Sequence, residues 1–497
     1  MLLVFFVVAF VVTAGAQPVA TGAISNVTRV ESWSYFQPFV DRRASSDVAQ
    51  DKPPPRSDPL GNPNYTFVGD RAELGVRVAG SRFDLGGAFS YVRLENLPTR
   101  AIGPGGLGAG AFYFAATGVR YSYQLYLGEL TVKMKSATGG AAVTLGRMPF
   151  ASGGEYVGTS PSLERLKSER LHSRLIGNFE WSFYQRRFDG ARIDIDRTRW
   201  HVTASAFVPT QGGYEESTNL SMPKVQVATA SITRKEGTLT ASSARSTAQA
   251  FAYIYRDRRG EAATVDNMFS LNRRVNITIA TLGGSHARLT PTRAGEIDTV
   301  AWAAVQTGDW YGQHHQAASV AIEAGHRWTA PSYRPWVRAG YLWASGDRSA
   351  EDDRHGTFFQ MLPSSRKYAL SSVYTQMNLS DAFAQLQIEP RWLLARIELH
   401  ALHLASGADL WYQGSGATAN RGRFFGFSGR IAHPSTALRT SGPVALGSVL
   451  EGTIDVPIRT FWSINGYAGV MSAGAAVRPQ FTSKPLTLWA VENVIRF

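Results

Sequence analysis

Arginine is the residue type whose number and spacing could carry chemistry in this chain. Only eight of the 51 basic residues are lysines, and with 38 acidic residues the formal net charge is +13. A guanidinium keeps its charge in a confined site and offers a planar fork to a carboxylate, whereas the ammonium of lysine is a strongly hydrated point charge. Arg71 and Arg77 alternate with Leu74 and Val76, so a strand would carry both arginines on one face. The predicted chemistry is therefore reversible binding of anions.

Catalytic and metal-binding patterns are weak by comparison. The chain has no cysteine, which removes disulfides, thiol catalysis and thiolate metal sites. His314 and His315 are adjacent, so on a strand they would point to opposite faces and would not share a metal ion. We expect no catalytic residue, no metal site and no cofactor. Two alternatives stay open: a pair of glycosidase carboxylates far apart in the sequence, and a calcium site in the acidic residues 351–353.

The first 64 residues divide into two parts. Residues 1–16 form an apolar run that ends with AGA at residues 14–16, a pattern typical of a signal peptide cleaved before Gln17. A membrane anchor is the alternative, although the run is shorter than the roughly 20 residues of a spanning helix. Residues 17–64 contain a polar, proline-rich tract that is unsuited to a core or to a regular ladder of hydrogen bonds. We interpret residues 17–64 as a periplasmic lead-in.

The rest of the chain, residues 65–497, alternates between apolar and polar residues in short segments separated by turn-forming residues. The alternation is clearest in residues 70–78, 126–135, 274–280 and 391–402. A soluble β-sandwich also alternates, but tryptophans near the segment ends favour a membrane barrel with interfacial aromatic girdles. These tryptophans are Trp181, Trp200, Trp302, Trp310, Trp328, Trp336, Trp343, Trp411, Trp462 and Trp489. We predict an all-β fold, a transmembrane antiparallel β-barrel of about 18 strands, with 16 as the alternative, of the bacterial outer-membrane type.

The C-terminal stretch predicts the closing strand of this barrel. Trp489 and Phe497 share a face that would contact lipid, whereas Glu492 and Arg496 share the opposite face. An open sheet edge in hydrocarbon would leave unpaired backbone amides at a cost of several kcal/mol each, so the last strand must pair with the first. We place the first strand at residues 70–78.

Charged residues on the inward face predict an anion-selective lumen, because rings of arginine attract anions and repel cations. The alternation predicts that five arginine side chains point into the lumen: Arg71, Arg77, Arg274, Arg338 and Arg396. Acidic residues interleaved with the arginines would keep binding weak enough for release. These predicted moderators are Glu73, Glu129, Asp194 and Glu398. The alternative for each arginine is a structural ion pair that braces the barrel wall.

Several blocks of the sequence resemble the alginate export family of outer-membrane proteins. They read LGRMPFASGGE, RLIGNFEWSFYQRRFDGARIDI, the long stretch from ASGDRSAEDDRHGTFFQMLP to QMNLSDAFAQ, LHLASGADLWYQGSGAT and FFGFSGR, in this order. The FFQMLP to QMNL stretch is the most specific. The resemblance implies an 18-stranded monomeric barrel with an arginine-rich constriction that exports a newly made polyuronate. It also implies gating by a periplasmic loop and an extracellular loop.

The resemblance also implies roles for individual residues. Arg147, Arg174, Asp189 and Arg192 match family motif positions that face or approach the pore, and Asp189 is assigned there as a further acidic moderator. The strand that carries Arg71 and Arg77 is similar to the opening strand of the family, whereas Arg338 and Arg396 are assigned to the pore by parity.

The resulting hypothesis is a channel in the outer membrane of a Gram-negative-type bacterium, and not an enzyme, that exports an anionic, uronate-type exopolysaccharide. The alternatives are an uptake porin selective for anions or sugars, and a secreted soluble β-protein that binds or cleaves polysaccharide. The expected partners are the polysaccharide, outer-membrane lipid, lipopolysaccharide, and a periplasmic polymerisation and secretion complex. We expect a monomer that does not bind nucleic acid.

Overall fold

The computed structural model describes most of the chain. The described residues are 19–36, 64–99, 110, 113–114, 117–213, 220–236, 244–259, 262–265, 268–274, 276–330, 332–349, 352–364, 375–412, 444–478 and 484–497. The predicted signal peptide at residues 1–16, the FFGFSGR block and Glu351 lie outside them, so these predictions stay as they are. Among the described helices, none is both long and apolar enough to cross a membrane.

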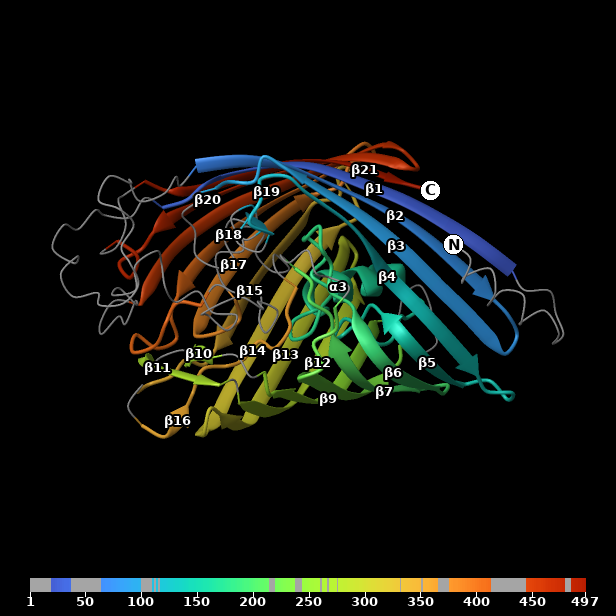
Figure 1. The fold of residues 1–497 in the computed structure, drawn as a ribbon. Coiled ribbons are helices and arrows are strands. Elements are labelled where there is room, and N and C mark those ends of the chain that lie inside the picture. The colour runs from blue at the N-terminus through green and yellow to red at the C-terminus, as the bar shows by residue number, and fades with distance from the viewer. Residues whose placement is uncertain are drawn as a thin grey trace.

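Within the described residues, eighteen strands form a closed ring in which each strand pairs antiparallel with the next (Figure 1). They are β1 (Val19–Ser34), β2 (Asn64–Ala79), β3 (Phe83–Glu95), β4 (Ser122–Lys135), β5 (Ala141–Met148), β6 (Phe188–Asp196), β7 (Trp200–Pro209), β8 (Val225–Arg234), β9 (Arg245–Asp257), β12 (Ile277–Pro291), β13 (Gly295–Trp310), β14 (Gln313–Trp328), β15 (Trp336–Ala344), β17 (Leu379–Ile388), β18 (Leu394–His403), β19 (Ala445–Arg459), β20 (Trp462–Ala473) and β21 (Leu486–Arg496). Closure pairs every strand on both sides, as a bilayer requires. The predicted all-β transmembrane barrel is confirmed.

Three short strands among the described residues are not members of the ring. β10 (Ala262–Val265) and β11 (Met268–Arg274) form a separate two-stranded sheet between β9 and β12. β16 (Arg354–His355) pairs parallel with β14. Because Arg274 ends β11, outside the ring, its predicted place on the inward face of a barrel strand is wrong.

The barrel begins earlier than the sequence pattern indicated. β1 pairs along its length with β2 and also with β21, with Ser25 opposite Arg496. The interpretation of residues 17–64 as a lead-in is therefore wrong for Val19–Ser34, which belong to the barrel wall. β1 is rich in small and polar residues, so it shows little of the apolar alternation on which strand prediction relies. The proline-rich tract lies almost wholly outside the described residues, but it connects β1 to β2.

The C-terminal strand closes the ring as predicted, although it pairs with β1 and not with residues 70–78. The amide of Phe497 donates to Ile24 O at 2.8 Å, and the amide of Ile24 donates to Phe497 O at 3.1 Å. Trp489 is 45% exposed on the outer surface, whereas Glu492 faces the lumen and accepts a hydrogen bond from Arg29. The alternation in β21 thus separates lipid-facing from lumen-facing side chains.

Two of the predicted strand faces differ from the structure. A bulge in β4 shifts the register opposite Ala88 and Phe89, so Tyr126 is buried in the interior while Leu130 is exposed outside. A bulge adds one residue and exchanges the two faces beyond it, which alternation alone does not reveal. In β12, Ile277 and Ile279 are fully buried in the interior. The apolar face of this strand therefore faces inward, opposite to the prediction.

Tryptophans contribute less to an outer girdle than predicted. Trp302, Trp310, Trp336 and Trp411 are buried in the interior core and Trp181 packs against it, so the girdle interpretation is wrong for these five. Trp200 and Trp489 are exposed, as a girdle requires. The interior thus contains an aromatic core in addition to polar groups.

The two ends of the barrel differ in the length of their connections. Short turns at residues 80–82, 197–199, 292–294 and 460–461 lie at one end, where β1 starts and β21 ends. At the other end, strands β5 and β6, β15 and β17, and β18 and β19 are each separated by more than 30 residues of sequence, whereas a two-residue turn joins β13 to β14. Outer-membrane barrels have short periplasmic turns and longer extracellular loops, so the short-turn end faces the periplasm.

Candidate functional site

The connection between β5 and β6, residues 149–187, folds into the barrel (Figure 1). Phe150 packs against Phe188 and Phe207 of the wall, with ring centroids 6.0 and 5.1 Å apart. Further along, Thr159 Oγ1 donates at 2.9 Å to Glu236, which lies two residues after β8 ends at the short-turn end of the barrel. The connection therefore descends from the long-loop end to the periplasmic mouth and returns. We call residues 149–187 the inserted segment.

The inserted segment contains helix α3 (Pro161–Arg170), which stands inside the ring in Figure 1. Proline at the first helical position and Glu164 in the first turn favour the helix start, and basic residues in its last turn favour the end. The amide of Ser160, the residue before the helix, donates a hydrogen bond to the carboxylate of Glu236 at 3.0 Å. A residue outside the inserted segment thus caps the start of the helix. Leu163 and Leu166 are buried, so α3 is fixed by packing as well as by its capping.

Three arginines converge on one carboxylate inside the barrel. Glu323 of β14 accepts Arg170 Nε at 2.6 Å, Arg174 Nη2 at 2.9 Å and Arg338 Nη1 at 2.8 Å. Arg338 also pairs with Asp298, which accepts the Trp336 indole at 2.7 Å. All of these charged groups are buried. We call Arg170, Arg174, Arg338, Glu323 and Asp298 the Glu323 cluster, and it joins the inserted segment to the wall.

Aromatic rings cover the same guanidinium groups. The guanidinium carbons of Arg170, Arg174 and Arg338 lie 4.6 Å from the Phe383 ring, 5.5 Å from the Trp302 ring and 4.9 Å from the Trp336 ring, respectively. A cation over an aromatic face gains about 0.5–2 kcal/mol. The interior tryptophans therefore stabilise buried arginine charge.

A cavity of about 430 Å³ lies between the inserted segment and strands β1, β2, β20 and β21. Arg29, Arg71 and Arg496 line it together with Trp181 and Glu492. Arg29 lies 3.8 Å above the Trp181 ring and donates to Glu492 Oε1 at 3.0 Å, and Arg71 donates to a backbone carbonyl of the inserted segment at 3.2 Å. We call this space the arginine cavity. It combines positive charge, an aromatic face and two carboxylates, those of Glu180 and Glu492.

Arg186 links the inserted segment to residues 356–364 of another inward connection. Its guanidinium donates to Gly177 O at 3.1 Å and to Leu362 O at 2.6 Å. The amide of Leu362 donates to Leu175 O at 2.8 Å beside this contact. Burial lowers the pKa of Arg186 to about 9, still above neutral pH, so the group stays charged and holds both connections.

The predicted arginines fall into distinct environments. Arg71 lines the arginine cavity, and Arg174 and Arg338 belong to the Glu323 cluster. Arg192 faces the lumen and is held by Asp194 at 2.7 Å and by the Glu155 carbonyl at 2.7 Å.

The remaining inward residues pair more loosely. Arg396 Nε lies 3.9 Å from Glu398. Arg77 is 73% exposed near the periplasmic end, with Nη2 3.7 Å from Glu129. Glu73 accepts Ser90 Oγ at 3.0 Å and lies 3.8 Å from Arg187 Nη2. Each predicted acidic moderator on the inward face thus has an arginine neighbour.

Arg147 and Asp189 do not line the lumen. They form a two-pronged ion pair across β5 and β6, with oxygen–nitrogen distances of 2.7 and 2.8 Å. Arg147 pairs across the sheet with Leu130, and Asp189 pairs with Val208. Leu130 and Val208 point to the outer surface of the barrel, and residues paired across a sheet point to the same face. Their predicted pore-facing position is therefore wrong. The motif match carried no information on the strand face.

Sequence reasoning missed several residues of these sites. Arg29 was missed because its strand was assigned to the lead-in, and Arg170 and Arg186 because they lie in the inserted segment, where no alternation exists. Glu323 alternates with the exposed Ile322, so the alternation in β14 could have identified it.

The barrel has solved structural neighbours. Acinetobacter baumannii OccAB1 is similar with a TM-score of 0.54 and 9% identity, covering 96% of each chain. Pseudomonas aeruginosa OccK2 (OpdF), solved in complex with glucuronate, is similar with a TM-score of 0.53 and 8% identity, covering 96% of this chain and 98% of that one. At such identity the likeness shows the fold, that of outer-membrane porins. No curated protein matches the sequence.

The family model for alginate export matches residues 162–490, which include all of α3 except Pro161, the Glu323 cluster and most of the barrel. Family and fold are those of an outer-membrane transport channel and not of an enzyme. The chain belongs to the alginate export family.

Proposed function

We propose that this protein exports an anionic, uronate-type polysaccharide across the outer membrane through its arginine-lined lumen. The observation that carries the proposal is the arginine cavity, where Arg29, Arg71 and Arg496 share a space with Trp181 inside a barrel of the alginate export family. A uronate unit has a carboxylate that matches a guanidinium fork and an apolar ring face that matches an indole.

The acidic groups beside the inward arginines favour weak, reversible binding of the polymer over tight binding. Glu492 lies in the arginine cavity and already accepts Arg29, so a passing carboxylate would compete with it. Conduction requires binding that is favourable enough for entry and weak enough for exit. We propose the same moderating role for Glu73, Glu129, Asp194 and Glu398 toward the inward arginines.

The Glu323 cluster would serve as a gate rather than as a free binding surface. Arg174 and Arg338 are committed to Glu323 and Asp298 while the inserted segment occupies the lumen. For a polymer to pass, the inserted segment has to move, which would release Arg170, Arg174 and Arg338 to the passing carboxylates. Arg77, Arg192 and Arg396 would add further sites along the wall.

A second candidate function is uptake of a small uronate. It is favoured by the fold of OccK2 (OpdF), whose structure was solved in complex with glucuronate. Both functions would use the same arginines, so they differ in the size of the solute and in the direction of transport. Lipopolysaccharide would surround the barrel in either case, and a secretion complex would meet the short-turn end only in the first.

Deletion of the gene in the producing strain tests the export proposal. We expect uronic-acid polymer to accumulate in the periplasm, and a plasmid carrying the wild-type gene to restore polymer at the surface. A Trp181→Ala, Arg71→Gln variant should restore less polymer than an Arg147→Gln control expressed at the same level, because Arg147 lies on the outer face of the barrel wall. Normal surface polymer in the deletion strain, together with lost growth on glucuronate, would favour the uptake porin instead.

A further inference from the structure

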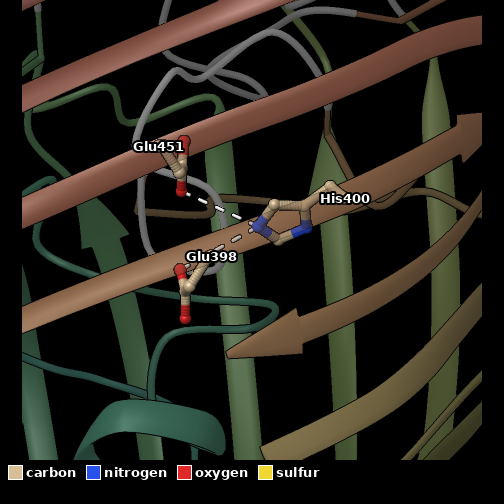
Figure 2. Close-up of side chains that lie close together, drawn as sticks. All are labelled: Glu398, His400 and Glu451. Atoms are coloured by element: carbon tan, nitrogen blue, oxygen red, sulfur yellow. Dashed lines mark ion pairs between the residues drawn. The ribbon is translucent and has the colours of Figure 1, made fainter. Parts of the chain in front are cut away.

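We propose that Glu398, His400 and Glu451 form a binding site for a divalent transition metal of the zinc class in the barrel wall. Glu398 and His400 lie two residues apart on β18, and Glu451 lies on the neighbouring strand β19. Figure 2 shows the imidazole pointing toward both carboxylates on the inner side of these strands. Imidazole nitrogen and carboxylate oxygen are ligands that zinc accepts.

The donor atoms are spaced for a shared ion. His400 Nε2 lies 3.7 Å from Glu451 Oε1 and 3.9 Å from Glu398 Oε2, and one donor atom from each residue lies within 4.8 Å of the others. Donors bound to one tetrahedral zinc lie about 3.3–3.6 Å apart, given metal bonds of about 2.0–2.2 Å. The two imidazole–carboxylate distances exceed this spacing by a few tenths of an ångström, and the two carboxylate oxygens, which lie within 4.8 Å of each other, would approach by at most about 1.5 Å. Side-chain rotation would complete the three-ligand set and leave a fourth position for water.

Neighbouring groups orient the imidazole. Asp381 on β17 accepts His400 Nδ1 at 3.0 Å, which would fix the tautomer whose Nε2 lone pair faces Glu398 and Glu451. The Phe383 ring stacks on the imidazole with centroids 5.8 Å apart. A carboxylate behind a histidine ligand is the usual outer shell of a zinc site.

The two carboxylates are oriented as well. Tyr467 Oη donates to Glu451 Oε2 at 3.3 Å, which leaves Oε1 directed at His400. Glu398 Oε1 faces Arg170 and Arg396, each at 3.9 Å, so Oε2 is the oxygen directed at His400. Each proposed ligand is thus preorganised by a group outside the site.

Burial and charge favour a cation at this point. Glu398, His400 and Glu451 are each at most 3% exposed, and Asp381 adds a third carboxylate around the ring. Buried carboxylates need compensating charge; Arg170 and Arg396, each 3.9 Å from Glu398, supply part of it, and a metal ion would supply the rest. The competing arrangement is a protonated imidazole that binds the same carboxylates without an ion, and the experiment separates the two.

The test is calorimetric titration of the full-length, EDTA-treated protein in detergent with zinc chloride. We expect one zinc ion per chain, and at least a hundredfold weaker binding in His400→Gln and in Glu451→Gln. Asp381→Asn should weaken binding by about 10- to 100-fold, because it orients a ligand without being one. His315→Gln, a buried histidine elsewhere in the wall, is the matched control and should bind as the wild type does.

Spectroscopy of the metal-loaded protein distinguishes the loss of a ligand from misfolding of a variant. Cobalt(II) in place of zinc should give a visible absorption band from nitrogen and oxygen ligands, and this band should be absent in Glu451→Gln protein that still shows heat-modifiable migration. The proposal is overturned if the wild type binds no stoichiometric zinc, or if His400→Gln and Glu451→Gln bind zinc with wild-type affinity. Either result would leave the protonated imidazole as the explanation.

Discussion

Replacement of Glu323 by glutamine is the sharpest perturbation of the inserted segment. The side chain keeps its shape, but Arg170, Arg174 and Arg338 lose the carboxylate on which they converge. Glu323 is 3% exposed, so solvent screens this charge poorly. Removing one partner of a buried ion pair costs about 3–5 kcal/mol. Because two of the three arginines belong to the inserted segment, most of that cost should appear as easier detachment of the segment from the wall.

The magnitude follows from the free energy. At 1.4 kcal/mol for each factor of ten, a cost of about 3–5 kcal/mol raises the detachment equilibrium constant by roughly 10²-fold to about 4 × 10³-fold. In planar bilayers the variant should therefore open more often and for longer than the wild type. Its heat-modifiable transition should also occur at a lower temperature, because the closed barrel loses the same interaction.

Glu389→Gln is the matched control for this experiment. Glu389 also accepts two arginines, Arg165 Nη1 at 2.9 Å from α3 and Arg327 Nη2 at 3.0 Å, but it is 22% exposed at the periplasmic mouth. Partly exposed pairs contribute about 0–1 kcal/mol, so this variant should stay close to the wild type. If Glu323→Gln opens no more often than Glu389→Gln and melts at the same temperature, the inserted segment is not held by the Glu323 cluster and the reasoning fails.

Three further predictions concern the two faces of the wall and the contact between inward connections. Arg147→Glu should leave ion selectivity in bilayers unchanged because Arg147 lies on the outer face of the barrel wall. Arg192→Glu should lower the preference for anions because Arg192 faces the lumen beside Asp194. Equal effects of the two substitutions would contradict the assignment of these residues to opposite faces. Leu282→Arg should lower the free energy of unfolding from liposomes by about 2–4 kcal/mol, the cost of a charge on the lipid face near the midplane; a urea titration that finds no loss would place this residue inside. Arg186→Met should lower the free energy of unfolding by about 1.5–3 kcal/mol through lost charge-assisted hydrogen bonds, and it should increase the current noise of the open channel. Current noise equal to that of the wild type would show that this contact does not restrain the inserted segment.

Many strands of the barrel wall could be predicted from the alternation of apolar and polar residues, and the wrong predictions have identifiable causes. The lipid and lumen faces of β18 follow directly from its residues, because Ile397 and Leu399 alternate with Arg396, Glu398 and His400. The alternation fails at β1, whose small and polar residues give no strong period, and at Tyr126, where a bulge exchanges the faces. It also fails where the interior is itself apolar, as at Ile277.

The candidate site was harder to predict than the wall. Arg71 and Arg338 could be assigned to the interior because they lie on regular strands. Arg170 and Arg186 could not, because their positions depend on how the inserted segment folds back through the barrel. Pairs such as Arg29 with Glu492 join the two ends of the chain, and sequence spacing carries no information about such contacts.

Current block by a soluble oligo-uronate in planar bilayers tests the central claim most directly. The lumen should prefer anions over cations, and the oligo-uronate should block the current at far lower concentration than a neutral oligosaccharide of equal length. Trp181→Ala and Arg71→Gln should each weaken that block, whereas Arg147→Gln should not. Equal block by the neutral oligosaccharide, or a preference for cations, would contradict an arginine-lined path for an anionic polysaccharide.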